Sequence, residues 1–175
     1  TGTDSTSGNT LFGYLAGEDV ASGGLNNTFI GHGAGKNITT GDNSVIIGGK
    51  AGDATIDSSH HVLIGVSAGG NGDIANDGTV AIGSNSLYAV TSGDSNTAVG
   101  YQAGKAMAGG VSNTIIGASA LSVASSALNS VAVGKDAMRD IKSGVSIDGC
   151  IAIGVSALLG NSSNTTDIDG TVAIG

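Results

Sequence analysis

The chain has 175 residues, of which 32 are glycine and none is proline or tryptophan. Glycine normally supplies about 7 per cent of a protein, and the apolar residues here are mostly Ala, Val and Ile, so a conventional core rich in large side chains is excluded. Six Lys and Arg against fourteen Asp and Glu give a net charge of −8, which excludes the clustered cations that nucleic acids and anionic membrane surfaces require.

Local features exclude further classes. No apolar run approaches the ~20 residues of a membrane-spanning helix. Cys150 is the single cysteine, so the chain has neither a disulfide framework nor a cysteine-based zinc pattern. Glycine does not recur at every third position, which excludes collagen. The composition is therefore typical of a repetitive, β-rich protein built from small residues.

A short motif, a β-branched or aromatic residue followed by glycine, recurs along the whole chain. We call this glycine the anchor and number the other positions of each copy from it. Successive anchors are 17 to 21 residues apart. The ten anchors are Gly13, Gly31, Gly48, Gly65, Gly83, Gly100, Gly117, Gly134, Gly154 and Gly175. They predict a lead-in over residues 1–8 and one repeat domain over residues 9–175, which we expect to be a segment of a longer fibre.

Each copy predicts a short strand that ends just before its anchor. Positions −1 and −3 hold mostly Ile, Val or Thr and point to one side of the strand, whereas position −2 holds Leu, Phe, Ile or Ala and points to the other. Both faces are apolar, which is typical of strands covered on two sides. A single solenoid needs one face for its own interior. The other face therefore predicts a partner along the full length, and a symmetric homo-oligomer is the simplest partner.

The remainder of each copy predicts a second short extended piece and then a polar turn. Position −4 is polar or small, and position +3 is Ala in all copies but one. Strings such as Gly41-Asp42 are typical of turns. Apolar residues at position +7 are expected to hold the second piece inward: Val20, Ile38, Val90, Met107 and Ile141. Helical periodicity is nowhere sustained, so the fold class is all-β, a parallel β-solenoid of about ten coils.

Several strings resemble known repeats. NSVIIG (43–48), NTAVG (96–100), NSVAVG (129–134) and TVAIG (79–83 and 171–175) resemble the YadA-type head repeats of trimeric autotransporter adhesins. NTAVGYQAG (96–104) is also similar to repeats of phage and large-virus fibre proteins. The resemblance implies a left-handed β-roll that forms an intertwined or side-by-side homotrimer outside a cell or on a virion. The coils of this chain are longer than those of the adhesin family.

The expected function is that of an extracellular structural and adhesive fibre segment, which is not an enzyme and uses no cofactor. Its variable turns would contact a host receptor or glycan, and the longest turns lie between Gly134 and Gly175. The alternative is a solenoid enzyme, either a hexapeptide-like acyltransferase or a tailspike that cleaves glycans. A tailspike needs paired carboxylates. The candidate pairs are Asp136 with Asp140 and Asp167 with Asp169.

Other motifs have simpler interpretations. Gly65-Val66-Ser67-Ala68-Gly69 matches the nucleophile pattern G-x-S-x-G, but its glycines and Ala68 occupy ordinary repeat positions. His61 fills the polar position −4, although the pair His60-His61 leaves an axial metal ion open. The fourteen acids occupy no single position of the repeat, so no calcium-binding repeat is predicted. We therefore predict no metal site and no catalytic residue, and the ligand-binding residues stay open.

Overall fold

The computed structural model describes residues 8–20, 23–55, 57–72, 74, 77–142, 144–160 and 167–175. Within this part of the chain, ten strands of three residues each form one parallel sheet in chain order. They are β1 (Thr10–Phe12), β2 (Thr28–Ile30), β3 (Val45–Ile47), β4 (Val62–Ile64), β5 (Val80–Ile82), β6 (Thr97–Val99), β7 (Thr114–Ile116), β8 (Val131–Val133), β9 (Ile151–Ile153) and β10 (Val172–Ile174).

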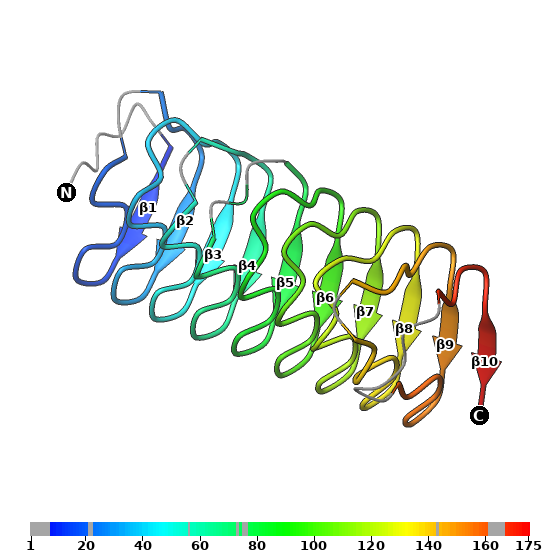
Figure 1. The fold of residues 1–175 in the computed structure, drawn as a ribbon. Coiled ribbons are helices and arrows are strands. Elements are labelled where there is room, and N and C mark those ends of the chain that lie inside the picture. The colour runs from blue at the N-terminus through cyan, green and yellow to red at the C-terminus, as the bar shows by residue number, and fades with distance from the viewer. Residues whose placement is uncertain are drawn as a thin grey trace.

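The architecture is an all-β parallel solenoid, as the sequence predicted. Every strand ends at position −1, directly before its anchor. Ten strands enclose nine intervals, so the chain makes about nine turns rather than ten full coils. In Figure 1 the strands lie side by side and point the same way, with β1 and β10 at opposite ends of the array. Residues 1–7 of the expected lead-in lie outside the described residues.

Strand pairing places each motif position on its counterpart in the next coil. Between β4 and β5, for example, Leu63 pairs with Ala81, and the other pairs of neighbouring strands keep the same register. Each position therefore forms a row along the solenoid axis. The row at position −2, here the inner row, is Leu11, Phe29, Ile46, Leu63, Ala81, Ala98, Ile115, Ala132, Ala152 and Ala173.

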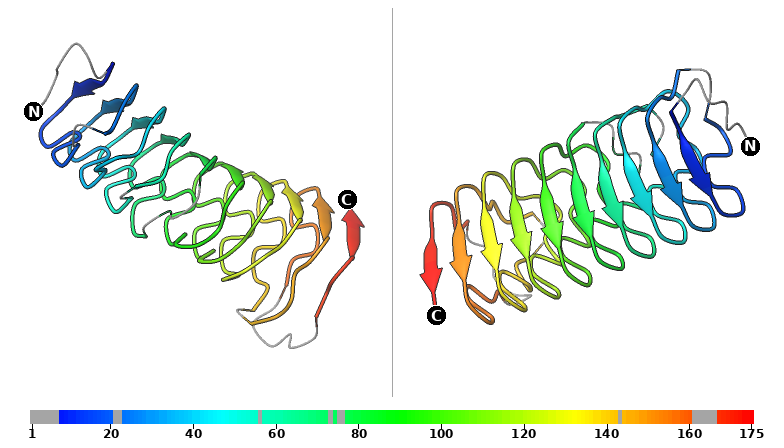
Figure 2. Two further views of the ribbon diagram at one scale, coloured as in Figure 1. Left: turned by 90° about the horizontal axis from the view of Figure 1, so that it is seen from above. Right: turned by 180° about the vertical axis from the view of Figure 1, so that it is seen from behind.

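Burial decides which face of the sheet is the interior. In β2 to β9 the inner-row residue is buried, and its two neighbours in the strand are half-buried or exposed. Ala residues at position +3 and the apolar residues at position +7 complete the core. Among the latter, Ile38, Val90, Met107 and Ile141 are buried and Val20 packs against the core from its edge, which confirms that position +7 faces inward. Figure 2 shows the turns closing each coil behind the sheet.

The expected second extended piece is wrong. The segment after each anchor is a series of turns, because positions +2 and +4 have left-handed backbone angles in every described copy. In the coil of Gly100 these are Gln102 with φ 57° and Gly104 with φ 61°. A β-strand needs negative φ at successive residues, so the chain bends twice here and returns toward the next strand.

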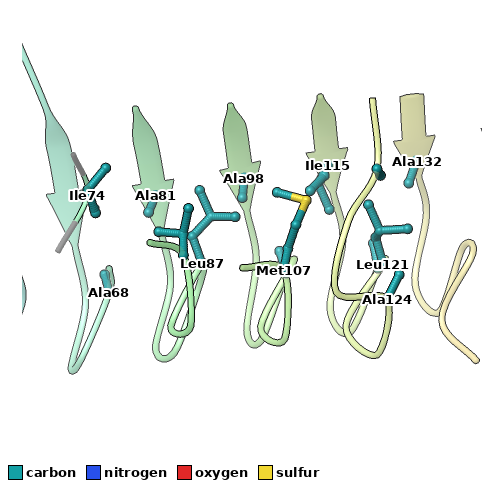
Figure 3. Packing of buried hydrophobic residues seen from close by; sticks show 14 of the residues in the cluster. Ala68, Ile74, Ala81, Leu87, Ala98, Met107, Ile115, Leu121, Ala124 and Ala132 are labelled. Atoms are coloured by element: carbon teal, nitrogen blue, oxygen red, sulfur yellow. The ribbon is translucent and has the colours of Figure 1, made fainter. Parts of the chain in front are cut away.

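Core volume is shared between positions −2 and +4. Where the inner row holds a large residue, position +4 is usually glycine, and a Cβ on Gly35 would lie 3.0 Å from the Phe29 ring. Where the inner row holds alanine, position +4 is usually large, as with Ala81 and Leu87, which Figure 3 shows together in the core. The chain accepts a left-handed, non-glycine residue at Leu87 (φ 47°) because that side chain fills the interior.

This sharing predicts a compensating pair of substitutions. Leu87→Gly leaves a cavity and is expected to cost about 3 kcal/mol, and Ala81→Leu crowds the core at about 1–3 kcal/mol. The double variant recreates the combination of Leu63 and Gly69 in the preceding coil, so its free energy of unfolding should return to within about 1 kcal/mol of the parent. Urea unfolding of the four proteins measures the coupling, and additive losses would contradict the shared volume.

Candidate functional site

The outer face of the sheet is apolar along its whole length. It consists of two rows, at positions −3 and −1, that contain only Thr, Val, Ile and Phe. We call them the outer rows. Their members are Thr10, Thr28, Val45, Val62, Val80, Thr97, Thr114, Val131, Ile151 and Val172 at position −3, and Phe12, Ile30, Ile47, Ile64, Ile82, Val99, Ile116, Val133, Ile153 and Ile174 at position −1.

The outer rows stay accessible in the single chain. Ile116 and Ile153, well inside the sheet, each keep an exposed fraction of 41%. Position +1 extends this face with exposed side chains such as Tyr101 and Val155. Tyr14 stacks on His32 in the next coil, with ring centroids 5.5 Å apart. At about 4.8 Å per strand the face is roughly 45 Å long. A continuous apolar surface of this length is typical of a protein–protein interface.

The acidic residues lie on the turns, and their arrangement corrects a sequence-based expectation. Five of them occupy one position of the repeat, −6: Asp42, Asp77, Asp94, Asp148 and Asp169. Carboxylates in this row accept backbone N–H groups from the preceding coil. Asp42 accepts from Leu25 at 2.7 Å, and Asp169 accepts from Asp148 at 2.8 Å. Their recurrence was hidden because the other copies hold uncharged residues there.

The carboxylate pairs considered for an enzyme form ion pairs and hydrogen bonds with other groups on the turns. Arg139 contacts Asp136 at 3.0 Å and Asp140 at 2.8 Å, and its guanidinium lowers the pKa of Asp140 from the usual value. Ser146 donates its backbone N–H to Asp167 at 2.9 Å and its hydroxyl to Asp169 at 2.8 Å. These contacts tie the turns together, and no contact of the pairs favours glycan cleavage over this structural role.

The three histidines have separate surroundings. His32 stacks on Tyr14, and exposed His60 has its Nδ1 3.6 Å from an oxygen of Asp77. His61 is fully buried. Within the described ranges, no group of three or more His, Cys, Asp or Glu side chains is arranged to hold a metal ion.

Ser67 of the G-x-S-x-G string follows the repeat. It is left-handed at φ 54°, like Gln102 at the same position +2. Its backbone N–H donates to Gly49 in the preceding coil at 3.0 Å, and Gln102 donates to Ser84 in the same way at 3.0 Å. The local geometry at Ser67 is therefore that of an ordinary turn of the solenoid.

A groove of about 420 Å³ opens among the long turns near the C-terminal end. It lies partly between Gly134 and Gly175, where the sequence predicted a ligand contact. Serine hydroxyls and one carboxylate line it together with apolar side chains. Its lining residues are Ser125, Ser126, Leu128, Gly144, Val145, Ser146, Ile147 and Asp167.

A buried polar row lies behind the sheet at position −4, and its role was not predicted from the sequence. Its members are Asn9, Asn27, Ser44, His61, Thr79, Asn96, Asn113, Ser130, Cys150 and Thr171. Seven of these side chains accept the backbone N–H of the next member, as Asn113 does from Ser130 at 3.0 Å. Asn113 also donates to the carbonyl of Ala127 at 2.7 Å, across the coil.

Cys150 belongs to the same row, but its side chain donates a hydrogen bond to the backbone. Burial raises the pKa of its thiol, which keeps the proton that Sγ donates to the carbonyl of Ile168 at 2.8 Å. Its backbone N–H donates to Ser130 at 3.1 Å. Cys150 therefore serves as a small hydrogen-bonding member of the polar row.

Comparisons with protein-family models, with curated proteins and with solved structures find no match to this chain. In the part of the chain that the structure describes, no helix has the length and apolar character to cross a membrane. The class of protein is therefore defined by the fold alone, as a parallel β-solenoid repeat protein with one long apolar face.

Proposed function

We propose that this chain is a segment of an extracellular fibre, in which copies of the solenoid associate through their outer rows. The observation that carries this proposal is the unbroken apolar face over all ten strands. The assembly we propose is a homotrimer of left-handed β-rolls, displayed on a cell surface or a virion. Its function is mechanical and adhesive: the rod holds the turns away from the surface that bears it.

Charge supports a second copy of this chain as the occupant of the outer face. Each chain carries a net charge of −8, so two copies repel each other over most of their surfaces. The outer rows contain no charged residue and so form a face on which copies can meet without burying like charges. A copy also has the same pitch, and its rows can follow those of its neighbour coil by coil.

The groove near the long turns supports an attachment role. Three serine residues and Asp167 line the groove together with apolar residues that include Ile147 and Leu128. Hydroxyls and a carboxylate can exchange hydrogen bonds with a polyhydroxylated ligand, and apolar side chains suit the C–H face of a sugar ring. We therefore place the proposed contact with a host glycan at this groove.

Native mass tests the assembly. Light scattering should give three times the chain mass of 16.7 kDa, and the assembly should survive mild heating in SDS. Ile64→Glu places a charge in the middle of the outer rows and should shift the mass toward that of one chain, because a buried unpaired carboxylate is strongly unfavourable at an interface.

Lys142→Glu is the matched control, since Lys142 is exposed on a turn away from the sheet. It also adds negative charge and should leave the trimer intact. Circular dichroism of both variants checks that each chain still folds. A parent protein that is monomeric at every concentration would refute the proposed assembly, and so would an Ile64→Glu variant that stays trimeric.

A further inference from the structure

The groove near the long turns contains a row of polar residues from three successive coils. Ser126, Ser146 and Asp167 all occupy position −8, and all three line the groove. Asp167 uses one carboxylate oxygen to accept the backbone N–H of Ser146 at 2.9 Å. Within the described part of the chain, its other oxygen has no hydrogen-bond partner. The groove therefore contains a carboxylate oxygen that a ligand can use.

Further carboxylates surround the groove without a compensating cation. Asp169 accepts the hydroxyl of Ser146 at 2.8 Å and the backbone N–H of Asp148 at 2.8 Å, so three carboxylates lie on these turns with Asp167. The residues that line the groove include no Lys, Arg or His. Among the described residues, no cation forms an ion pair with any of the three carboxylates. The negative charge of the groove is therefore not neutralised by the protein.

This charge restricts the sugars that the groove can accept. The cation nearest to the lining in the sequence is Lys142, which is exposed and is not a lining residue. The net charge of −8 adds a wider field that repels anions and attracts cations. A sulfated or carboxylated sugar would meet like charge, whereas an ammonium group would both carry the opposite charge and donate hydrogen bonds. Such charge-assisted hydrogen bonds are about twice as strong as neutral ones.

We propose that the groove selects sugars that carry a free amine, and that the sugar ammonium donates to the open oxygen of Asp167. This inference rests on the glycan contact proposed above and names its class of ligand. The exposed hydroxyl of Ser126 exchanges hydrogen bonds with the sugar hydroxyls, and Leu128, which is 39% exposed, contacts the ring. An acetylated amine is a neutral amide, so it lacks the charge that Asp167 recognises.

Two tetrasaccharides that differ only at the amine test the selection. The probes are the tetramer of glucosamine and the tetramer of N-acetylglucosamine, each titrated into the parent protein by calorimetry at pH 6 and physiological salt. Amines are ordinarily protonated and carboxylates ionised at this pH, and the salt screens charges more than about 8 Å apart. The glucosamine tetramer should bind about tenfold more tightly than its acetylated form.

Asp167→Asn removes the charge and keeps the turn. Asparagine retains one oxygen to accept the N–H of Ser146, and its other group becomes a donor that cannot bind an ammonium. This variant should bind the two tetramers with affinities within about twofold of each other. Asp19→Asn is the matched control, because Asp19 is an exposed carboxylate in the first coil and its loss changes the net charge equally. It should keep the tenfold preference.

The outcomes distinguish this inference from the function on which it rests. If the parent binds both tetramers equally, or the acetylated one more tightly, the groove binds glycans but the selection by charge is overturned. If Asp19→Asn loses as much preference as Asp167→Asn, the attraction comes from the whole chain and the assignment to Asp167 is overturned. If neither tetramer binds, the inference fails together with the proposed glycan contact, and the native mass still decides the assembly.

Discussion

Alanine in place of Gly48 is expected to destabilise the solenoid by about 4 kcal/mol or more, an effect reserved for severe backbone or core defects. Gly48 has φ +135°, a conformation that side chains rarely adopt, and an added Cβ would lie 2.4 Å from the carbonyl oxygen of Gly65. That oxygen belongs to the next anchor, so it cannot retreat without opening the sheet. Urea unfolding followed by circular dichroism measures the loss.

Gly49→Ala is the matched control. Gly49 follows Gly48 directly, yet a Cβ there would meet nothing within 4 Å, and its backbone is not left-handed. Its substitution should change the free energy of unfolding by no more than about 0.5 kcal/mol. Equal losses of unfolding free energy for the two variants would show that the anchor position has no special role among the glycines. A selective loss at Gly48 would show that coils stack through the anchor backbone.

The anchors explain why so much of the fold was predictable. Every coil requires glycine at its anchor, so each coil can be recognised in the sequence. The strand directly precedes the anchor, and its residues can be located from it. All ten predicted strands are present for this reason. The segment after the anchor was mispredicted because its left-handed residues include Leu15, Lys50 and Gln102, which carry no glycine signal.

The choice of the buried face could not be made from apolar character alone, because both faces are apolar. The discriminating signal is volume: the inner row alternates between large residues and alanine according to position +4, and the outer rows show no such dependence. The dependence on volume also extends between neighbouring coils, as Ile115 and Ala98 show. Ile115 reaches toward Gly104 of the preceding coil, where a Cβ would lie 3.1 Å from its Cδ1, and so fills space that Ala98 leaves.

The candidate site was predictable in part. The apolar outer rows follow from strand alternation, but the different surroundings of His60 and His61 depend on the left-handed φ of 63° at His60, which turns one ring to the surface while the next lies inside. Position −4 was visibly polar. That most of the row is buried, and that several of its side chains accept a backbone N–H of the next coil, follows only from the stacked coils.

Substitution of Asn113 by leucine is expected to destabilise the solenoid by about 2–4 kcal/mol. Leucine matches asparagine in shape but leaves the backbone N–H of Ser130 unpaired, and the carbonyl of Ala127 loses one bond while it still accepts the N–H of Val111. The unpaired N–H costs about 1–3 kcal/mol, and the lost bond to Ala127 costs about 1 kcal/mol more. Exchange of the Ser130 amide and the free energy of unfolding are the two measurements, and both should report the loss.

Asn113→Ser distinguishes the two lost bonds. Serine already works in this row, since Ser44 accepts the backbone N–H of His61 at 3.1 Å. At position 113 it should keep the Ser130 amide protected and lose only the bond to Ala127, so about 1 kcal/mol of the destabilisation should remain. If leucine proves neutral or stabilising, burial of an apolar side chain outweighs the polar row, and the solenoid is held by its core and strand ladder alone. If leucine is costly and serine intermediate, the row contributes to stability coil by coil, in addition to the core and the strand ladder.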